Sequence, residues 1–320
     1  MLDKILGILP PGYRQALRAI DLTRAEELRL RAGQRPTILQ NGAERAFLLA
    51  SGSGRVTQED LQRTLMAACA QSQYAVQEQL REGFVSLPGG FRLGVCGCVI
   101  LQNGQPGGIR EISSLALRIP HDVHHDSARL LPLLTDSTLL IGPPGSGKTT
   151  LLRSCIRALS GAGRRVAVAD ERMELAGCVG GTAQFDLGAH TDVLSGCPKR
   201  AAMLMLLRGM NPAWIAVDEI THPDDLRAIR QLAGCGVRLL ATIHAAAPDE
   251  LLQRPLARDV LTAGVFRQMI ILNDDRTFCT ERISYAQNDR SESDFRFVQR
   301  GGAFDGARGS GAAIAAACAY

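Results

Sequence analysis

Aromatic side chains are scarce in this sequence of 320 residues: they make up 4% of it, and there is a single tryptophan. Proteins that bind single-stranded nucleic acid commonly stack bases on aromatic side chains in a basic groove. The 36 Lys and Arg residues exceed the 32 Asp and Glu residues by only four, and they are spread along the chain. The sequence carries no recognisable RNA-binding motif. We therefore expect no direct contact with nucleic acid.

Long apolar runs are also missing. No segment approaches the ~18 consecutive apolar residues that suggest a membrane-spanning helix. Residues 1–11 lack the basic region and long apolar stretch of a signal peptide. We expect a cytoplasmic protein that is peripheral to the membrane.

The nine cysteines form no pattern typical of a disulfide framework or a zinc site. Their number is odd and several lie within apolar runs, which favours reduced thiols. Cys96 and Cys98 form a close pair, but no second pair lies at zinc-site spacing. His121, His124 and His125 lie in a polar segment typical of a solvated linker. We predict no metal other than Mg²⁺.

A glycine-rich motif points to a ligand. A strand-like apolar run, 137–141, precedes it, and a helical segment, 149–159, follows it. The backbone N–H groups of such a P-loop bind nucleotide phosphates, its lysine reaches the β- and γ-phosphates, and its threonine offers a hydroxyl to Mg²⁺. The sequence therefore predicts a site for ATP and Mg²⁺. Its residues are Gly142, Pro143, Pro144, Gly145, Ser146, Gly147, Lys148, Thr149 and Thr150.

Two carboxylates follow the apolar run 214–217, and a P-loop needs such an acidic strand end beside it. We expect Asp218 to support the Mg²⁺ ion together with Thr149. Glu219 is the candidate general base that polarises the attacking water.

Two further strand-like runs end in polar residues. Residues 166–169 lead into Asp170 and Glu171, and residues 239–243 lead into His244. Ligands of open parallel sheets bind at the carboxyl ends of the strands. We therefore predict that Glu171 and His244 join Glu219 as catalytic residues near the γ-phosphate.

The length and the patterning favour two domains. Residues 1–120 are expected to form a mixed α/β domain, with a helix capped at Thr57 and a hairpin of strands 84–87 and 91–101, followed by strand 112–119. Strands then alternate with helices, which predicts a mostly parallel sheet. The expected divisions are a linker at 121–136, a P-loop ATPase domain at 137–286 that closes with a hairpin (265–272 and 276–284), and a largely disordered tail at 287–320.

This order of parts resembles the type II/IV secretion ATPase superfamily. Residues 170–174 look like its Asp box, residues 218–220 like its Walker B segment and residues 242–245 like its His box. The resemblance covers residues 10–285. Within the superfamily, the chain is most similar to the stage III sporulation AA branch, and the segments that show this similarity are 82–90, 112–119, 191–194 and 197–199.

The resemblance implies a RecA-like fold and a Mg²⁺-dependent ATP hydrolase. It further implies a homo-oligomeric ring, a hexamer, that energises or assembles a secretion-like channel between mother cell and forespore together with membrane proteins. Basic residues of the N-terminal domain, Arg92, Arg110 and Arg118, are further candidates for the nucleotide site. Arg208 is a weaker one.

The chain departs from the family pattern at two positions. His190 stands where an arginine is expected, and Thr221 stands where a glycine is usual. A neutral histidine binds phosphate less well than arginine, so the His190 departure suggests slow ATP hydrolysis. One alternative is therefore a slow nucleotide switch that scaffolds assembly. The other is a P-loop ATPase that translocates nucleic acid, because related folds translocate DNA or RNA.

Overall fold

The computed structural model describes residues 5–49, 54–72, 76–102, 104–273, 275, 277–285 and 295–299. The chain divides into two compact units. The first consists of Met1–His121 with Ala176–Phe185, and the second of Asp122–Leu175 with Asp186–Tyr320. Each unit has a hydrophobic core of its own.

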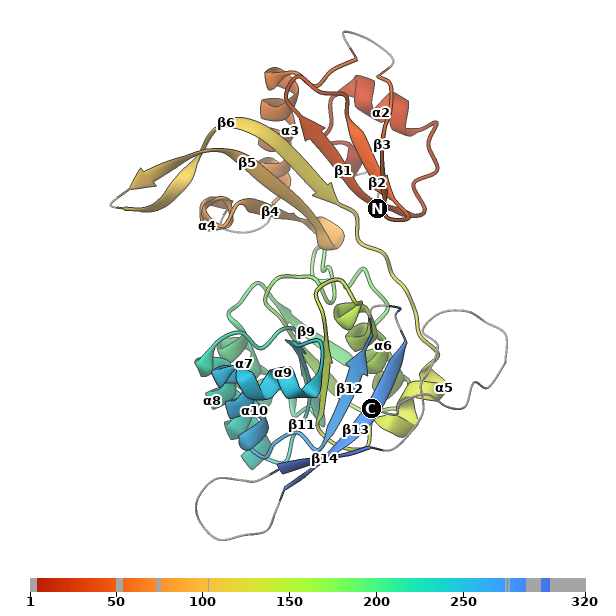
Figure 1. Ribbon diagram of the computed structural model, residues 1–320, viewed down its shortest axis with the longest axis vertical. Coiled ribbons are helices and arrows are strands. Elements are labelled where there is room, and N and C mark those ends of the chain that lie inside the picture. The colour runs from red at the N-terminus through yellow and green to blue at the C-terminus, as the bar shows by residue number, and fades with distance from the viewer. Residues whose placement is uncertain are drawn as a thin grey trace. The chain divides into compact units, whose positions relative to one another are not determined.

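The first unit is built on a six-stranded antiparallel sheet in the order β3-β2-β1-β6-β5-β4 (Figure 1). Alternate residues such as Leu28, Leu30, Leu115 and Leu117 are buried, as expected of strands with one face against a core. The strands are β1 (Ala25–Arg31), β2 (Thr37–Gln40), β3 (Ala43–Ala46), β4 (Phe84–Leu87), β5 (Phe91–Gln102) and β6 (Gln105–Arg118), and the helices are α2 (Pro11–Leu17), α3 (Gln58–Gln71) and α4 (Val76–Arg81).

The predicted hairpin of β4 and β5 is confirmed. The predicted strand 112–119 is confirmed in position but was too short, because β6 begins at Gln105. Residues 105–111 contain proline and two glycines, which weaken the strand signal in the sequence. They pair with the far half of β5, beyond a register shift between Cys96 and Cys98.

The capping box at the start of α3 is confirmed. The Thr57 hydroxyl accepts a hydrogen bond from the Asp60 N–H (3.1 Å), and the Asp60 carboxylate accepts one from the Thr57 N–H (2.9 Å). We expect Thr57→Ala to lower the free energy of unfolding by about 1 kcal/mol, whereas Thr57→Ser keeps the cap and loses much less. Urea denaturation of the three proteins measures this difference. Equal stability of Thr57→Ala and the wild type would contradict it.

The second unit is built on an eight-stranded sheet in the order β14-β13-β12-β7-β11-β10-β8-β9 (Figure 1). Adjacent strands from β12 to β9 pair in parallel, and β13 and β14 add an antiparallel edge. The sheet is thus mostly parallel, and the closing hairpin of β12 and β13 is confirmed. The strands are β7 (Thr138–Gly142), β8 (Val166–Asp170), β9 (Thr191–Ser195), β10 (Trp214–Val217), β11 (Arg238–His244), β12 (Gln268–Leu272), β13 (Phe278–Tyr285) and β14 (Phe295–Gln299).

Helices cover both faces of this sheet. On one face the core joins alternate strand residues such as Leu139, Ile215 and Leu239 to helices α7 (Lys199–Met210), α8 (Pro223–Gly234) and α10 (Pro255–Thr262). Helix α6 (Lys148–Gly161) contacts β7, β8 and β11 and buries most of its length. The remaining helices are α5 (Ser127–Leu130), a 3₁₀ turn at Leu131–Leu133, and α9 (Pro248–Gln253).

Two segments differ from expectation. Residues 191–195 form the edge strand β9. The sequence had indicated only a segment typical of the family at 191–194, and no strand was predicted there. The disordered tail predicted from residue 287 was wrong for Phe295–Gln299, which form β14 against β13. The rest of that tail lies outside the described residues. Among the described helices, none is both long and apolar enough to cross a membrane.

Candidate functional site

The P-loop runs from the end of β7 to the start of α6. Gly145 and Gly147 have φ values of 79° and 99°, a left-handed conformation that glycine adopts without a steric penalty. A Cβ atom built at either glycine would meet nothing within 4 Å, so the loop is open there. A Cβ at Gly142 would lie 2.6 Å from Ser146 Oγ and 3.0 Å from the Leu272 carbonyl oxygen, so this position requires glycine.

The Lys148 side chain lies folded back under this loop. Its Nζ donates hydrogen bonds to the carbonyl oxygens of Gly142 (2.8 Å) and Pro143 (2.7 Å). Burial lowers the pKa of Lys148, and the nearby negative charges of Asp218 and Glu219 oppose that shift. A buried ammonium held only by carbonyl dipoles and nearby carboxylates is well placed to gain from a phosphate anion.

The Asp218 carboxylate connects the P-loop to the neighbouring strand. Its Oδ2 accepts a hydrogen bond from the Thr149 hydroxyl (2.8 Å), and its Oδ1 accepts one from the Thr242 hydroxyl (2.6 Å). The Thr242 hydroxyl accepts in turn from the Glu219 N–H (2.7 Å). Carboxylate and hydroxyl oxygens are ligands suited to Mg²⁺, so this pair fits the predicted metal role. The Ser146 hydroxyl oxygen is buried and has no hydrogen-bond partner among the described residues, which also fits a loop that binds a further group.

Glu219 has an unusual backbone and two partners for its carboxylate. Its φ is 49°, a left-handed conformation that is uncommon for a residue with a side chain. Its Oε2 accepts a hydrogen bond from Arg172 Nη1 (2.6 Å), and its Oε1 lies 3.2 Å from His244 Nε2. The predicted proximity of Glu219 and His244 is therefore present, with Arg172 as an addition.

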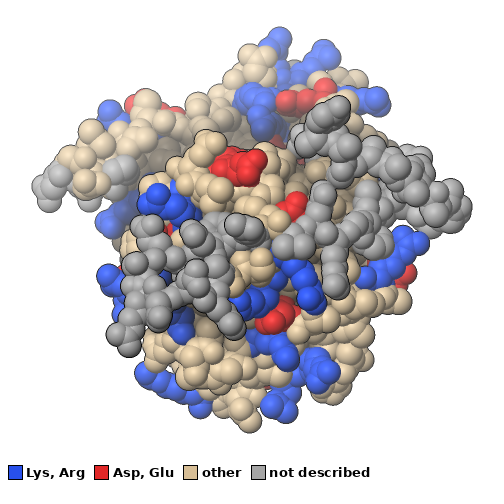
Figure 2. Space-filling view, turned by 60° about the horizontal axis from the view of Figure 1, so that its bottom comes forward, with Lys and Arg blue, Asp and Glu red and all other residues tan. Residues whose placement is uncertain are grey.

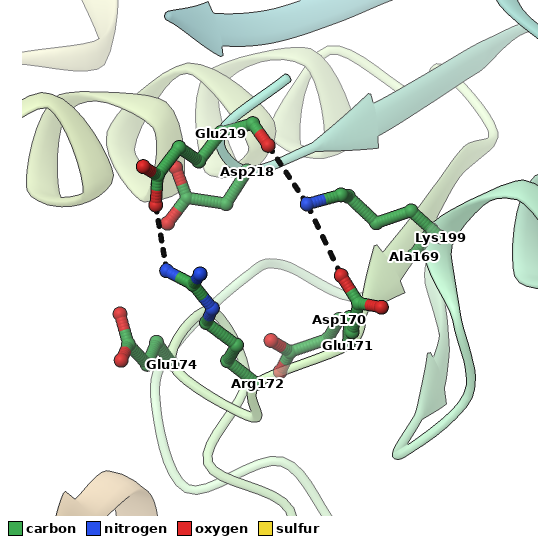
Figure 3. Close-up of a pocket in the computed structure, with 8 residues that line it drawn as sticks. All are labelled: Ala169, Asp170, Glu171, Arg172, Glu174, Lys199, Asp218 and Glu219. Atoms are coloured by element: carbon green, nitrogen blue, oxygen red, sulfur yellow. Dashed lines mark hydrogen bonds and ion pairs between the residues drawn. The ribbon is translucent and has the colours of Figure 1, made fainter. Parts of the chain in front are cut away.

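Glu171 reaches the same pocket through a lysine. Its Oε2 lies 3.1 Å from Lys199 Nζ, which also donates a hydrogen bond to the Glu219 carbonyl oxygen (2.7 Å). Figure 3 shows Lys199 between these two acidic residues and Arg172 facing the Glu219 carboxylate. The residues that line this pocket are Ala169, Asp170, Glu171, Arg172, Glu174, Lys199, Asp218 and Glu219.

Three of the residues that make these contacts were not predicted from the sequence as members of the site: Arg172, Lys199 and Thr242. For Lys199 the sequence contains a usable signal. Only three of its 36 basic residues are lysines, Lys4, Lys148 and Lys199, and the last two lie at this one site. Lysine and arginine are not interchangeable, because the lysine ammonium is a compact point charge, so a rare lysine is a reason to examine its position.

His190 does not belong to the P-loop site of its own chain. Its N–H donates to the Ser160 hydroxyl (2.8 Å), and its Nδ1 lies 3.0 Å from the Ser160 carbonyl oxygen. Ser160 is in the last turn of α6, twelve residues after Lys148, which corresponds to about 18 Å along the helix. His190 is therefore not a phosphate contact of the P-loop in its own chain.

Four further basic residues were candidates for the nucleotide site. Arg208 is exposed in the last turn of α7, whereas the site lies at the first turn of that helix. Arg92, Arg110 and Arg118 are in β5 and β6 of the first unit, where Arg92 stacks on the Phe84 ring at 3.7 Å. Thr221 donates its N–H to Asp225, near the start of α8.

Comparison with known structures identifies the fold. The ATPase DotB of Legionella pneumophila has a TM-score of 0.55 and 16% identity over 90% of this chain and 80% of that one. The pilus retraction motor PilT with bound ADP has a TM-score of 0.53 and 17% identity over 89% and 80% of the two chains. The predicted α/β fold with a RecA-like second domain is confirmed.

Sequence comparison identifies the family. The stage III sporulation protein AA of Bacillus subtilis (strain 168) is 35% identical over 285 residues, which is 85% of this chain and 91% of the Bacillus protein. The family model described as "Sporulation stage III, protein AA" matches residues 2–291. The chain therefore belongs to the sporulation stage III protein AA family, and its fold is similar to those of DotB and PilT.

Proposed function

We propose that this chain is a Mg²⁺-dependent ATPase that energises or assembles a sporulation-specific, secretion-like channel between mother cell and forespore. The observation that carries the proposal is the hydrogen-bonded path from Thr149 through Asp218 and Thr242 to the N–H of Glu219. This path joins the P-loop to the candidate base. A site that only bound phosphate would not need the contacts of Thr242 with Asp218 and with the Glu219 N–H.

The site residues have different proposed roles. Lys148 exchanges its two carbonyl partners for β- and γ-phosphate oxygens, and the loop N–H groups bind the remaining phosphate oxygens. Thr149 and Asp218 would hold Mg²⁺, which neutralises charge on the phosphate oxygens when bound.

Glu219 then acts on water. Its carboxylate accepts a proton as the water oxygen attacks the γ-phosphorus and the bond to the bridging oxygen breaks, giving ADP and phosphate. His244 and Arg172 hold the two carboxylate oxygens and so fix their direction. Glu171 belongs to the same group of charges through Lys199.

The names of the relatives support the proposed partners and location. The Bacillus protein is named for stage III of sporulation, and the two solved structures are named as an ATPase and a pilus retraction motor. We infer a homo-oligomeric ring, a hexamer, in the cytoplasm of the mother cell, docked on membrane proteins of the channel. On the face shown in Figure 2 the described Lys and Arg side chains are scattered in small groups, which does not favour a nucleic-acid motor.

Native mass measurement tests the ring. We expect the purified chain to form hexamers with a non-hydrolysable ATP analogue and Mg²⁺, and we expect turnover per subunit to rise as the protein concentration is raised through the assembly range. Lys148→Ala is the matched control, since it should stay unassembled under the same conditions. A protein that remains a monomer and hydrolyses ATP at a concentration-independent rate would contradict the motor.

The slow-switch alternative depended on His190, and that residue is bonded at the opposite end of α6 from the P-loop. We do not advance it.

A further inference from the structure

Lys199 is a buried charge in the first turn of α7. Its side chain is 6% exposed, and its ammonium group has two partners across the pocket, the carboxylate of Glu171 and the backbone carbonyl of Glu219. These partners follow two different strands, β8 and β10. One side chain therefore ties together the two strand ends that carry the acidic residues (Figure 3).

Lys199 contacts the backbone of Glu219, which has a strained conformation. Left-handed conformations of residues other than glycine persist only where the surroundings hold them. Here the Glu219 N–H is held by the Thr242 hydroxyl (2.7 Å) and the Glu219 C=O by Lys199 (2.7 Å). Both peptide groups that flank Glu219 are thus fixed. The direction of its side chain, toward Arg172 and His244, depends on that fixed backbone.

The chemistry of the position calls for lysine. A carbonyl oxygen and a carboxylate oxygen on opposite sides are best met by a compact ammonium group with three donors, whereas arginine presents a wide planar fork. The chain uses lysine at only three positions, and the other lysine among the described residues is Lys148 of the P-loop. The use of lysine at position 199 therefore agrees with the geometry of its two oxygen partners.

We propose that Lys199 is a positioning residue for hydrolysis, which sets the orientation of Glu219 and draws Glu171 to the same site. The proposal rests on the proposed ATPase function. Lys199 acts through these two residues, so its loss should reduce the rate of the chemical step and leave nucleotide binding to the P-loop.

The test is a graded series at position 199. Lys199→Met removes both contacts, while Lys199→Gln can still donate to the Glu219 carbonyl oxygen but lacks the charge for Glu171. We expect kcat to fall on the order of 10- to 100-fold in Lys199→Met and to lie between that value and the wild type in Lys199→Gln. The Kd of a non-hydrolysable ATP analogue should stay within about threefold of the wild type, because the P-loop is intact.

Arg200→Met is the matched control. Arg200 is the next residue of α7, is exposed and pairs with Asp224 at 3.5 Å, so its loss removes a neighbouring charge without touching the site. We expect wild-type kcat in this variant. A purely structural role for Lys199 predicts instead that kcat follows the melting temperature across the series, and that result would overturn the proposal.

A double-variant cycle adds a second readout. If Lys199 acts partly through Glu171, the double variant Lys199→Met, Glu171→Gln should lose less activity than the product of the two single losses. Independent losses would refute the coupling. Glu219→Gln in the same assays separates this inference from the function on which it rests. Full turnover by Glu219→Gln refutes the ATPase mechanism, whereas an inactive Glu219→Gln beside a fully active, folded Lys199→Met refutes only the role of Lys199.

Discussion

Replacing Glu219 with glutamine is expected to lower ATP turnover on the order of 10³-fold. A positioned general base contributes roughly 10²- to 10⁴-fold, and an amide cannot accept the proton of the attacking water. Glutamine has nearly the same shape, and the backbone contacts of residue 219 with Thr242 and Lys199 do not involve the side chain. The loss should therefore appear in kcat, with nucleotide affinity within about threefold of the wild type.

Phosphate release under saturating ATP and Mg²⁺ measures the rate, and calorimetry with a non-hydrolysable analogue measures the affinity. Glu59→Gln is the control, because Glu59 is an exposed carboxylate of α3 whose partner is Arg63. It should behave as the wild type. Turnover by Glu219→Gln within a few-fold of the control would remove Glu219 from the mechanism.

Replacing Lys148 with alanine is expected to weaken ATP binding by about 100-fold, equivalent to ~2.7 kcal/mol. The ammonium group is buried, and its pKa is lowered chiefly by that burial. A charge in such surroundings forms strong charge-assisted contacts with phosphate oxygens, and alanine can make none of them. The variant also loses the bonds to the Gly142 and Pro143 carbonyls, so the loop itself is less well fixed.

Isothermal calorimetry with ATP and Mg²⁺ measures this effect directly. Arg164→Ala removes an exposed cation just beyond the far end of α6 and should bind ATP as the wild type does. A Lys148→Ala protein that binds ATP with wild-type affinity would mean that nucleotide is bound elsewhere.

The parts of the site that could be predicted from the sequence are those marked by a local pattern, either consecutive motif residues or polar residues that follow an apolar strand. The P-loop residues are consecutive, so their spacing specifies a local turn. Asp218, Glu219, Glu171 and His244 could be found because each follows a strand-like apolar run, and parallel strands end at one edge of the sheet.

Contacts that depend on packing between elements could not be predicted in this way. Lys199 reaches the pocket from the first turn of α7, and nothing around it in the sequence shows which strands that turn faces. His190 is a second example. It was compared with a family position by sequence alone, and its bond to Ser160 became evident only in three dimensions.

The same reason explains the missed strands. β14 lies in a charged segment with a weak strand pattern, and it is held by pairing with β13. The first half of β6 contains Pro106, Gly107 and Gly108, and it is held by pairing with the far half of β5. Tertiary pairing overrides weak local preference at both places.

The most direct test of the central claim is phosphate release by the purified wild-type chain with ATP, in parallel with and without Mg²⁺. The proposed site predicts release that saturates with ATP, that stops when EDTA removes Mg²⁺, and that falls on the order of 10³-fold in Glu219→Gln. Release that is the same in the wild type and in Glu219→Gln, or that continues unchanged in EDTA, would contradict the claim that Thr149, Asp218 and Glu219 form an ATPase site.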